Sequence, residues 1–189
     1  MKRKIENYIK DSIAAKEDLL KSQIVNIESA AKAIIESLKC GKKLLIFGNG
    51  GSASDSQHIA AELVGRFKME RKALPAIALT ANTSILTAIA NDYGYDAVFS
   101  RQIEALGVKG DVALGISTSG NSKNVIEALK RARSIGMKAI ALSGGDGGSI
   151  SREADISIVV AAIDTPRVQE SHILIAHIIC ALVEEGMFR

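Results

Sequence analysis

The hydrophobic positions of the first 40 residues recur at helical spacing. Spacing of three, four or seven residues places apolar side chains on one face of a helix, and Gly41 supplies a stop signal. We therefore predict one or two long helices before the sheet. They present more apolar side chains than one short sheet covers, so we expect a second subunit to bury them; packing across their own domain is the alternative. The apolar positions are Ile5, Ile9, Ile13, Leu20, Ile24, Ile27, Ile34, Ile35 and Leu38.

From Lys43 onward, short apolar runs alternate with helical segments. Such alternation is typical of a parallel sheet whose strands are buried on both faces. We predict an α/β, flavodoxin-like doubly wound fold with strand order 2-1-3-4-5, in which ligands bind at the carboxyl ends of strands one and three. The predicted strands are 44–47, 76–79, 112–116, 138–142 and 156–160. The predicted helices after the N-terminal ones are 54–66, 83–91, 96–106, 122–135, 150–154 and 166–185.

Two turns rich in glycine, serine and asparagine follow the first and third predicted strands, and each opens a helix. Their sequences are Gly48-Asn49-Gly50-Gly51-Ser52 and Ser117-Thr118-Ser119-Gly120-Asn121-Ser122. Glycine lets the backbone approach a ligand, hydroxyls donate to phosphate oxygens, and free N–H groups at a helix start attract an anion. We interpret the pair as a phosphate or phosphosugar site. Ordinary helix capping is the alternative.

The first turn also matches part of a dinucleotide-binding pattern, because Gly48-x-Gly50-x-x-Ala53 follows a strand and precedes a helix. That pattern expects an acidic residue about 20 positions later, at the end of the second strand, to hold the ribose. The second predicted strand ends Ala78-Leu79-Thr80, with no acid. The sequence therefore favours a site without a nucleotide cofactor.

Candidate chemistry lies on two of the predicted helices. His58 and Glu62 stand four residues apart, so both project from one face toward the predicted crevice. Gln169 and His177 stand eight apart, about two turns, on one side of the last helix. Two histidines, a glutamate and a glutamine can ligate a divalent metal such as zinc. Glutamine is an uncommon zinc ligand and the spacing is not a standard motif, so spacing alone does not favour a metal site. A surface role for His58 and a hydrogen-bonded core role for His177 remain open.

Composition narrows the class of protein. The chain has 189 residues, 47% of them hydrophobic and 24% charged, which is enough for one core. We predict a single domain, with residues 1–40 used in oligomerisation and residues 41–189 forming the sheet and active site. The net charge is only +3 and its basic residues are scattered, which disfavours nucleic-acid binding. The longest apolar run, 173–183, is shorter than the roughly 18 residues of a membrane span, so we expect no bilayer crossing.

Two further sequence features indicate the compartment. The two cysteines, Cys40 and Cys180, make no disulfide framework and fit a reducing environment. The basic N-terminal residues are followed by mixed polar and apolar positions, so we expect no secretory signal. Together these features predict a cytoplasmic protein.

Five segments, taken together, resemble the phosphoheptose isomerase family, which is built on the sugar isomerase (SIS) fold. The similarity runs nearly end to end. It implies an aldose–ketose isomerase that converts sedoheptulose 7-phosphate to D-glycero-D-manno-heptose 7-phosphate, the first step toward nucleotide-activated heptose for bacterial surface polysaccharide, whether lipopolysaccharide or capsule. It also implies a homotetramer with active sites at subunit boundaries. The segments are Gly48 to Ser52, His58-x-x-x-Glu62, Asn91-Asp92-Tyr93-Gly94, Ser117 to Ser122, and Arg167-Val168-Gln169-Glu170 with His177.

The resemblance also implies roles for individual residues. The phosphate would be held by Ser52, Ser117, Thr118, Ser119 and Ser122, in a cradle also lined by Asn49, Gly50 and Gly51. The rest of the substrate would contact Glu62, Asn91, Asp92 and Gln169. One zinc ion per active site would be bound by His58, Glu62, Gln169 and His177.

In the implied reaction, Glu62 is the base that takes a proton from C1, and His177 is the acid that completes exchange with C2 through a cis-enediol. No redox cofactor takes part. A zinc-bound carboxylate is a poorer base, so the sequence leaves open how Glu62 serves as both ligand and base. Some relatives carry an aspartate immediately before Arg167, where this chain has Pro166, and we assign no role to Asp164.

Two other functions stay open at this point. A non-catalytic SIS protein, either a regulator that senses sugar phosphates or a partner of a replication initiator, would keep the fold and much of the phosphate turn. The presence of a plausible acid and base, Glu62 and His177, favours an enzyme instead. An isomerase of hexose or pentose phosphates would share the phosphate site and differ in its contacts to sugar hydroxyls.

Overall fold

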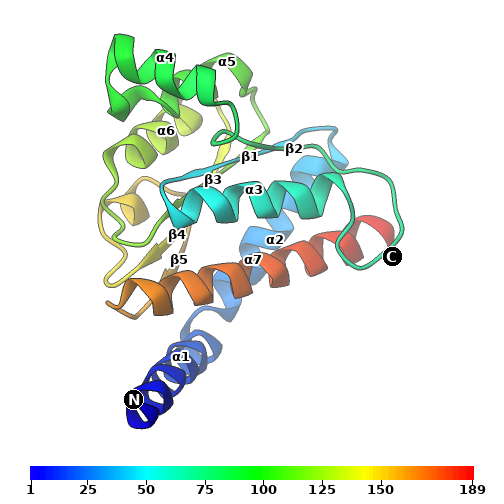
Figure 1. The fold of residues 1–189 in the computed structure, drawn as a ribbon. Helices are drawn as coiled ribbons and strands as arrows, with labels where there is room; N and C mark the ends of the chain where they lie inside the picture. The colour runs from blue at the N-terminus through cyan, green and yellow to red at the C-terminus, as the bar shows by residue number, and fades with distance from the viewer.

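A five-stranded parallel sheet forms the centre of the computed structural model, which describes all of residues 1–189. The strand order is β2-β1-β3-β4-β5, as predicted, and helices cover both faces (Figure 1). Strands β1 and β3 pair from Leu44↔Val112 to Gly48↔Ile116, so the turns that follow them lie side by side. The strands are β1 (Leu44–Gly48), β2 (Ala76–Ala78), β3 (Val112–Ser117), β4 (Lys138–Gly144) and β5 (Ile156–Val160).

Two apolar cores lie on the two faces of the sheet. Ile34, Ile46 and Ile175 belong to the first, which packs α2, α3 and α7 on one face, and Phe99 and Leu129 belong to the second, under α5 and α6. The predicted helices are confirmed with shifted ends, except that the predicted helix 96–106 is divided into a 3₁₀ helix and α5, and the one at 150–154 is a 3₁₀ helix. They are α1 (Lys2–Ser22), α2 (Ile24–Lys39), α3 (Gly51–Val64), α4 (Thr83–Tyr93), α5 (Ser100–Leu106), α6 (Lys123–Ser134) and α7 (Thr165–Phe188), with short 3₁₀ helices at Tyr95–Ala97 and Ser149–Arg152.

The edge strands differ from the sequence-based expectation. Every residue of β1 and β3 is buried, but in β2 the side chain of Ile77 is exposed and in β5 Ile156 is only partly buried. The prediction that all five strands are buried on both faces is therefore wrong for β2 and β5. The helical layers cover the middle of the sheet and leave part of its two edges open.

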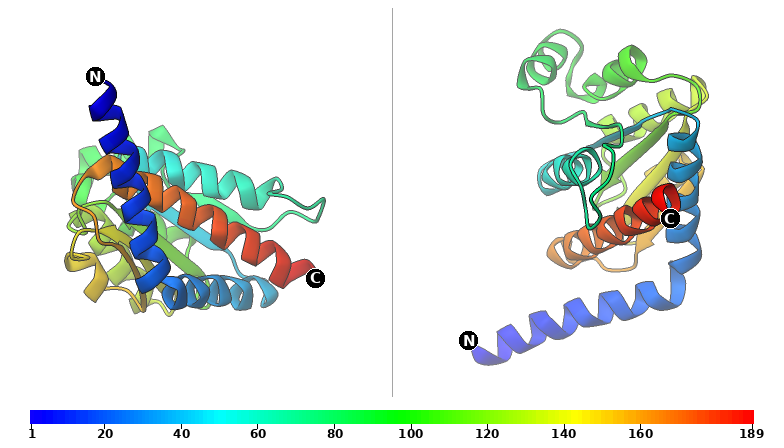
Figure 2. Two further views of the ribbon diagram at one scale, coloured as in Figure 1. Left: turned by 90° about the horizontal axis from the view of Figure 1, so that it is seen from below. Right: turned by 90° about the vertical axis from the view of Figure 1, so that its right-hand side faces the viewer.

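The N-terminal helices are used differently from each other. Helix α2 packs on the sheet through residues such as Ile27 and Ile34, whereas α1 lies outside the helical layers and contacts the start of α7 (Figure 2). Along α1, the side chains of Ile5, Ile9 and Ile13 are each more than half exposed. The predicted surplus of apolar surface is thus present on α1, and its use in oligomerisation stays a prediction.

Helix α7 is long and apolar enough to cross a membrane by length and composition alone. In the fold it lies on the sheet between α2 and α3, with residues such as Val168, Ile175 and Ile179 buried. It is therefore a core helix of this fold. Helix α7 also runs alongside α3 (Figures 1 and 2), which brings the two helices with candidate chemistry together.

Candidate active site

The two glycine- and serine-rich turns meet at the carboxyl ends of β1 and β3. The side-chain amides of Asn49 and Asn124 pair reciprocally, each Nδ2 donating to the other Oδ1 at 2.9 Å. The Tyr95 hydroxyl donates to Asn49 Oδ1 at 3.2 Å. These bonds join the first turn to the first residues of α6, so the two turns form one polar cradle.

Three serine hydroxyls gather in this cradle at the start of α6. Ser117 Oγ lies 2.9 Å from Ser122 Oγ and 3.5 Å from Ser119 Oγ. Gly120 allows this tight turn, because its φ is +66° and a Cβ there would lie 2.4 Å from the carbonyl oxygen of Gly147. Clustered hydroxyls at a helix N-terminus offer several donors to one anion. This arrangement suits an anionic group such as phosphate, and phosphate binding stays a prediction.

The start of α3 forms the other side of the cradle. Ser52 lies buried in its first turn, and Gly50, with φ +55°, leads into the helix. Gln169 of α7 packs directly on Gly51, where a Cβ would lie 2.4 Å from the Gln169 Nε2 atom. The Gln169 amide therefore lies beside the cradle.

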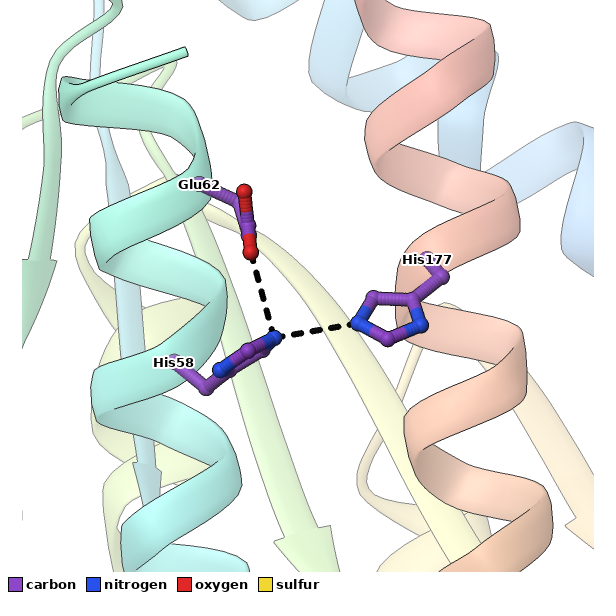
Figure 3. Close-up of side chains that lie close together, drawn as sticks. All are labelled: His58, Glu62 and His177. Atoms are coloured by element: carbon purple, nitrogen blue, oxygen red, sulfur yellow. Dashed lines mark hydrogen bonds and ion pairs between the residues drawn. The ribbon is translucent and has the colours of Figure 1, made fainter. Parts of the chain in front are cut away.

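His58 and Glu62 of α3 face His177 of α7 (Figure 3). His58 Nε2 lies 3.0 Å from His177 Nε2 and 3.2 Å from Glu62 Oε1. One ligand atom from each of the three residues lies within 4.8 Å of the others. The His58 side chain is 47% exposed, so a small ligand can reach this triad from solvent.

The triad suits a divalent metal ion. Two imidazole nitrogens and one carboxylate oxygen form a known ligand set of catalytic zinc sites, which leave one position open. Tetrahedral zinc with bonds of about 2.0–2.1 Å separates its ligand atoms by about 3.3 Å. The observed separations of 3.0 and 3.2 Å around His58 are close to that value. His58, Glu62 and His177 therefore fit a metal ion.

The fourth predicted ligand, Gln169, contacts the start of α3. Gln169 contacts Gly51, which precedes His58 by seven residues on α3. Seven residues of helix correspond to about 10 Å. His58, Glu62 and His177 lie together in this chain, Gln169 lies beside the serine-rich cradle, and its role as a ligand stays a prediction.

Comparison with known proteins gives the family. The SIS domain family model matches residues 7–144. A curated phosphoheptose isomerase of Clostridium acetobutylicum is 55% identical over 190 residues, covering 100% of this chain and 97% of the relative. The chain belongs to the phosphoheptose isomerase family.

Two more phosphoheptose isomerases agree with this assignment. That of Geobacter sulfurreducens is 60% identical over 162 residues, or 86% of each protein. The solved structure of the phosphoheptose isomerase from Neisseria gonorrhoeae superimposes with a TM-score of 0.93 at 45% identity, over 97% of this chain and 98% of the other. The predicted SIS fold is confirmed.

Two predicted substrate contacts lie at the end of α4, just before Tyr95, whose hydroxyl reaches Asn49 of the first turn. Asn91 and Asp92 are exposed at the end of α4, where Asn91 Nδ2 donates to Asp92 Oδ1 at 2.8 Å. No hydrogen bond joins either residue to the serine turns or the triad. Their roles toward sugar hydroxyls stay predictions.

Sequence reasoning missed two residues beside the triad. Asp55 lies on α3 one turn before His58, and its Oδ2 atom is buried without a hydrogen-bond partner. Burial raises the pKa of the Asp55 carboxyl, although charge on His58 or His177 acts in the opposite direction. The spacing of Asp55, His58 and Glu62 on one helical face could have indicated that Asp55 belongs to the site.

The second missed residue is Phe67, whose ring centroid lies 5.5 Å from that of His177. Phe67 lies in an irregular segment without a hydrophobic pattern, so the sequence carries no signal for this contact.

Proposed function

We propose that this protein is an aldose–ketose isomerase that converts sedoheptulose 7-phosphate to D-glycero-D-manno-heptose 7-phosphate. The observation that carries the proposal is the meeting of a carboxylate, Glu62, and an imidazole, His177, around His58. These groups lie on α7 and on the same α3 helix that begins at the phosphate cradle. Membership of the phosphoheptose isomerase family supports the substrate class. We assign the reaction to the cytoplasm and to the start of nucleotide-activated heptose synthesis for a bacterial surface polysaccharide.

The cradle binds the phosphate end of the substrate in this proposal. Three clustered serine hydroxyls, those of Ser117, Ser119 and Ser122, supply donors, and the helix starts of α3 and α6 supply free N–H groups. Ser52, Thr118 and the backbone of Asn49 to Gly51 complete the lining. An anchored phosphate fixes the position of the reacting carbons, which removes much of the entropy cost of reaction.

The reaction is a proton transfer between neighbouring carbons. A proton next to a carbonyl is weakly acidic, so it needs a positioned base and stabilisation of the charge that develops on oxygen. Glu62 takes the proton from C1 while the carbonyl oxygen on C2 gains one, which gives the cis-enediol. His177 supplies a proton to C2 as the hydroxyl on C1 loses its own, and the product is the aldose.

We propose zinc as the ion held by His58, Glu62 and His177, on the basis of their donor atoms and spacing. Bound there, it would polarise the substrate oxygen as a Lewis acid. In this proposal the Gln169 amide, which lies beside Gly51, contacts the substrate between phosphate and carbonyl. We keep Gln169 as the fourth proposed ligand of the metal ion, alongside His58, Glu62 and His177.

We also propose a homotetramer with active sites near subunit boundaries. The apolar side chains of Ile5, Tyr8, Ile9 and Ile13 on α1 are 51–57% exposed in the single chain. A surface of this kind is typical of a helix that packs against further copies. Size-exclusion chromatography with light scattering measures the assembly directly, and a stable monomer would contradict it.

Turnover tests the proposed reaction. Purified protein is incubated with sedoheptulose 7-phosphate and the aldose product is followed by NMR. Glu62→Gln and His177→Gln each remove one group of the proton relay, and we expect a loss of about 10²–10⁴-fold in kcat. Glu127→Gln, which changes an exposed carboxylate on α6, is the matched control and retains activity.

The outcomes separate the alternative functions. Binding of the sugar phosphate without aldose formation by the unaltered protein would support the regulator and contradict the isomerase. Faster turnover of a hexose or pentose phosphate in the same assay would assign a different substrate. Removal of bound metal with a chelator is expected to abolish turnover, and one zinc ion per chain is expected to restore it. Full activity of the metal-free protein would contradict the metal assignment.

A further inference from the structure

A solvent-excluded ion pair joins the two helices that carry the triad. Arg71 lies in the segment between α3 and β2, and Glu184 lies on α7, seven residues after His177. Arg71 Nε is 3.0 Å from Glu184 Oε1, and the two side chains are only 1% and 2% exposed. Buried charges destabilise a fold unless their bonding capacity is satisfied. The partners of each charge therefore show which parts of the chain the pair holds.

The Arg71 guanidinium binds the end of α3. Its terminal nitrogens donate to the carbonyl oxygens of Glu62 at 2.8 Å, Leu63 at 2.7 Å and Gly65 at 3.1 Å. The last carbonyls of a helix have no partner within the helix, and a cation there also favours the helix dipole. Arg71 thus fixes the last turn of α3, including the backbone of Glu62.

The Glu184 carboxylate binds the chain that follows α3. It accepts the backbone N–H groups of Phe67 at 2.9 Å, Lys68 at 2.9 Å and Met69 at 3.1 Å. Burial alone would raise the pKa of the Glu184 carboxyl, but these three donors and Arg71 outweigh it and hold the pKa below its usual range. The same segment places the Phe67 ring against His177.

We propose that Arg71 and Glu184 are positioning residues of the isomerase: the pair sets the spacing of α3 and α7 across the triad and seats Phe67 on His177. Neither residue touches the reacting atoms, and the proposal rests on the function proposed above. His58 and His177 come from the two helices that the pair ties, and their Nε2 atoms lie 3.0 Å apart. A displacement of about 1 Å in such a site can lower the rate by about 10²-fold.

The chain contains a matched control for a merely structural role. Asp111 is also a buried carboxylate, with its side chain 1% exposed, and lies 2.6 Å from Lys43 Nζ. It accepts the backbone N–H groups of Lys43 and Val108 as well. None of these partners lies on α3 or α7. Loss of the Asp111 charge therefore perturbs a similar buried pair without touching the triad helices.

Kinetics of the metal-loaded enzyme with sedoheptulose 7-phosphate test the proposal first. Glu184→Gln keeps the side-chain shape and removes the charge, and we expect kcat to fall about 10- to 100-fold. KM is expected to stay within about twofold, because the phosphate cradle lies at the other end of α3. Asp111→Asn is expected to lower Tm and leave kcat within about twofold. Unchanged kcat in Glu184→Gln, or equal losses in both variants, would overturn the proposal.

A spectroscopic readout separates this proposal from the proposed function. Phe67→Leu removes the ring next to His177 and keeps an apolar side chain, so it tests the placement even if Glu184→Gln does not fold. We expect the ring-proton resonances of His177 to shift in Phe67→Leu and in Glu184→Gln, while those of His172 on the same helix stay in place. A His177 resonance unmoved in both variants would refute the positioning role, whereas inactive wild-type protein with shifted resonances would refute only the isomerase assignment.

Discussion

His172 makes the stability of this fold depend on pH through a single buried ring. It lies on α7 with its side chain packed against β4, and its Nε2–H donates to the Ser143 carbonyl oxygen at 3.1 Å. A carbonyl only accepts, so Nε2 carries the proton, and the buried Nδ1 atom has no partner. Burial lowers the pKa of His172 from 6.5 to about 4, although the bond to Ser143 acts in the opposite direction.

The size of the effect follows from this shift. As the pH falls below 6.5, the unfolded chain takes up a proton that the folded protein does not take up until about pH 4. The contribution of the neutral ring is therefore complete above pH 6.5 and is lost on acidification. The free energy of unfolding falls through this group by about 2 kcal/mol between pH 8 and pH 5, and by about 3 kcal/mol at pH 4.

Denaturant unfolding of the wild type and His172→Gln measures this contribution. Glutamine keeps an N–H for the Ser143 carbonyl and does not titrate, so acidic residues elsewhere contribute equally to both proteins. At one fixed protein concentration, we expect the wild type to lose about 2 kcal/mol more than the variant between pH 8 and pH 5. A variant that is less stable at every pH still satisfies this test. Parallel curves for the two proteins would refute the reasoning.

Three further predictions concern other buried groups. Burial raises the pKa of the Cys180 thiol to about 12, so a thiol reagent at pH 8 should modify only the exposed Cys40 in the folded protein; rapid modification of both contradicts this. Gly120→Ala forces a Cβ to within 2.4 Å of the Gly147 carbonyl oxygen, and we expect a lower Tm and weaker binding of inorganic phosphate by calorimetry; wild-type values would refute it. Glu184→Gln removes a carboxyl whose pKa is lowered by folding. The free energy of unfolding of the wild type should therefore fall more steeply than that of the variant as the pH drops from 6 through that depressed pKa. Equal slopes of the two proteins in acid unfolding experiments would argue against it.

The sheet and the cradle could be predicted because their signals are local. Apolar runs of four or five residues predicted the five strands, and the strand order placed the turns after Phe47 and Ile116 side by side. The four-residue spacing of His58 and Glu62 gave one shared face, and α7 supplied His177 opposite it. The helix ends were less accurate: α3 begins at Gly51 because the turn itself already forms the first hydrogen bonds of the helix.

The long-range parts of the site could not be predicted. Phe67 and Arg71 lie in an irregular segment, and only the fold shows that they contact α7. Glu184 interrupts the apolar pattern of α7, but the sequence does not show which residue it pairs with. The position of Gln169 depends on how α7 crosses the start of α3, since eight residues on one helix separate it from His177 by about 12 Å. Exposure of Ile77 likewise depends on where the helical layers end.

The fixed spacing of residues along helix α3 bears on the length of the molecule that the site accepts. Ser52 and His58 are six positions apart on this helix, an interval of about 9 Å along its axis. Hydrogen-bonded backbone keeps that interval constant, so in the proposed function α3 sets the distance between the phosphate and the carbons that react. A shorter carbon skeleton would engage one end at a time, and the energy gained at the first could not be used to orient atoms at the second.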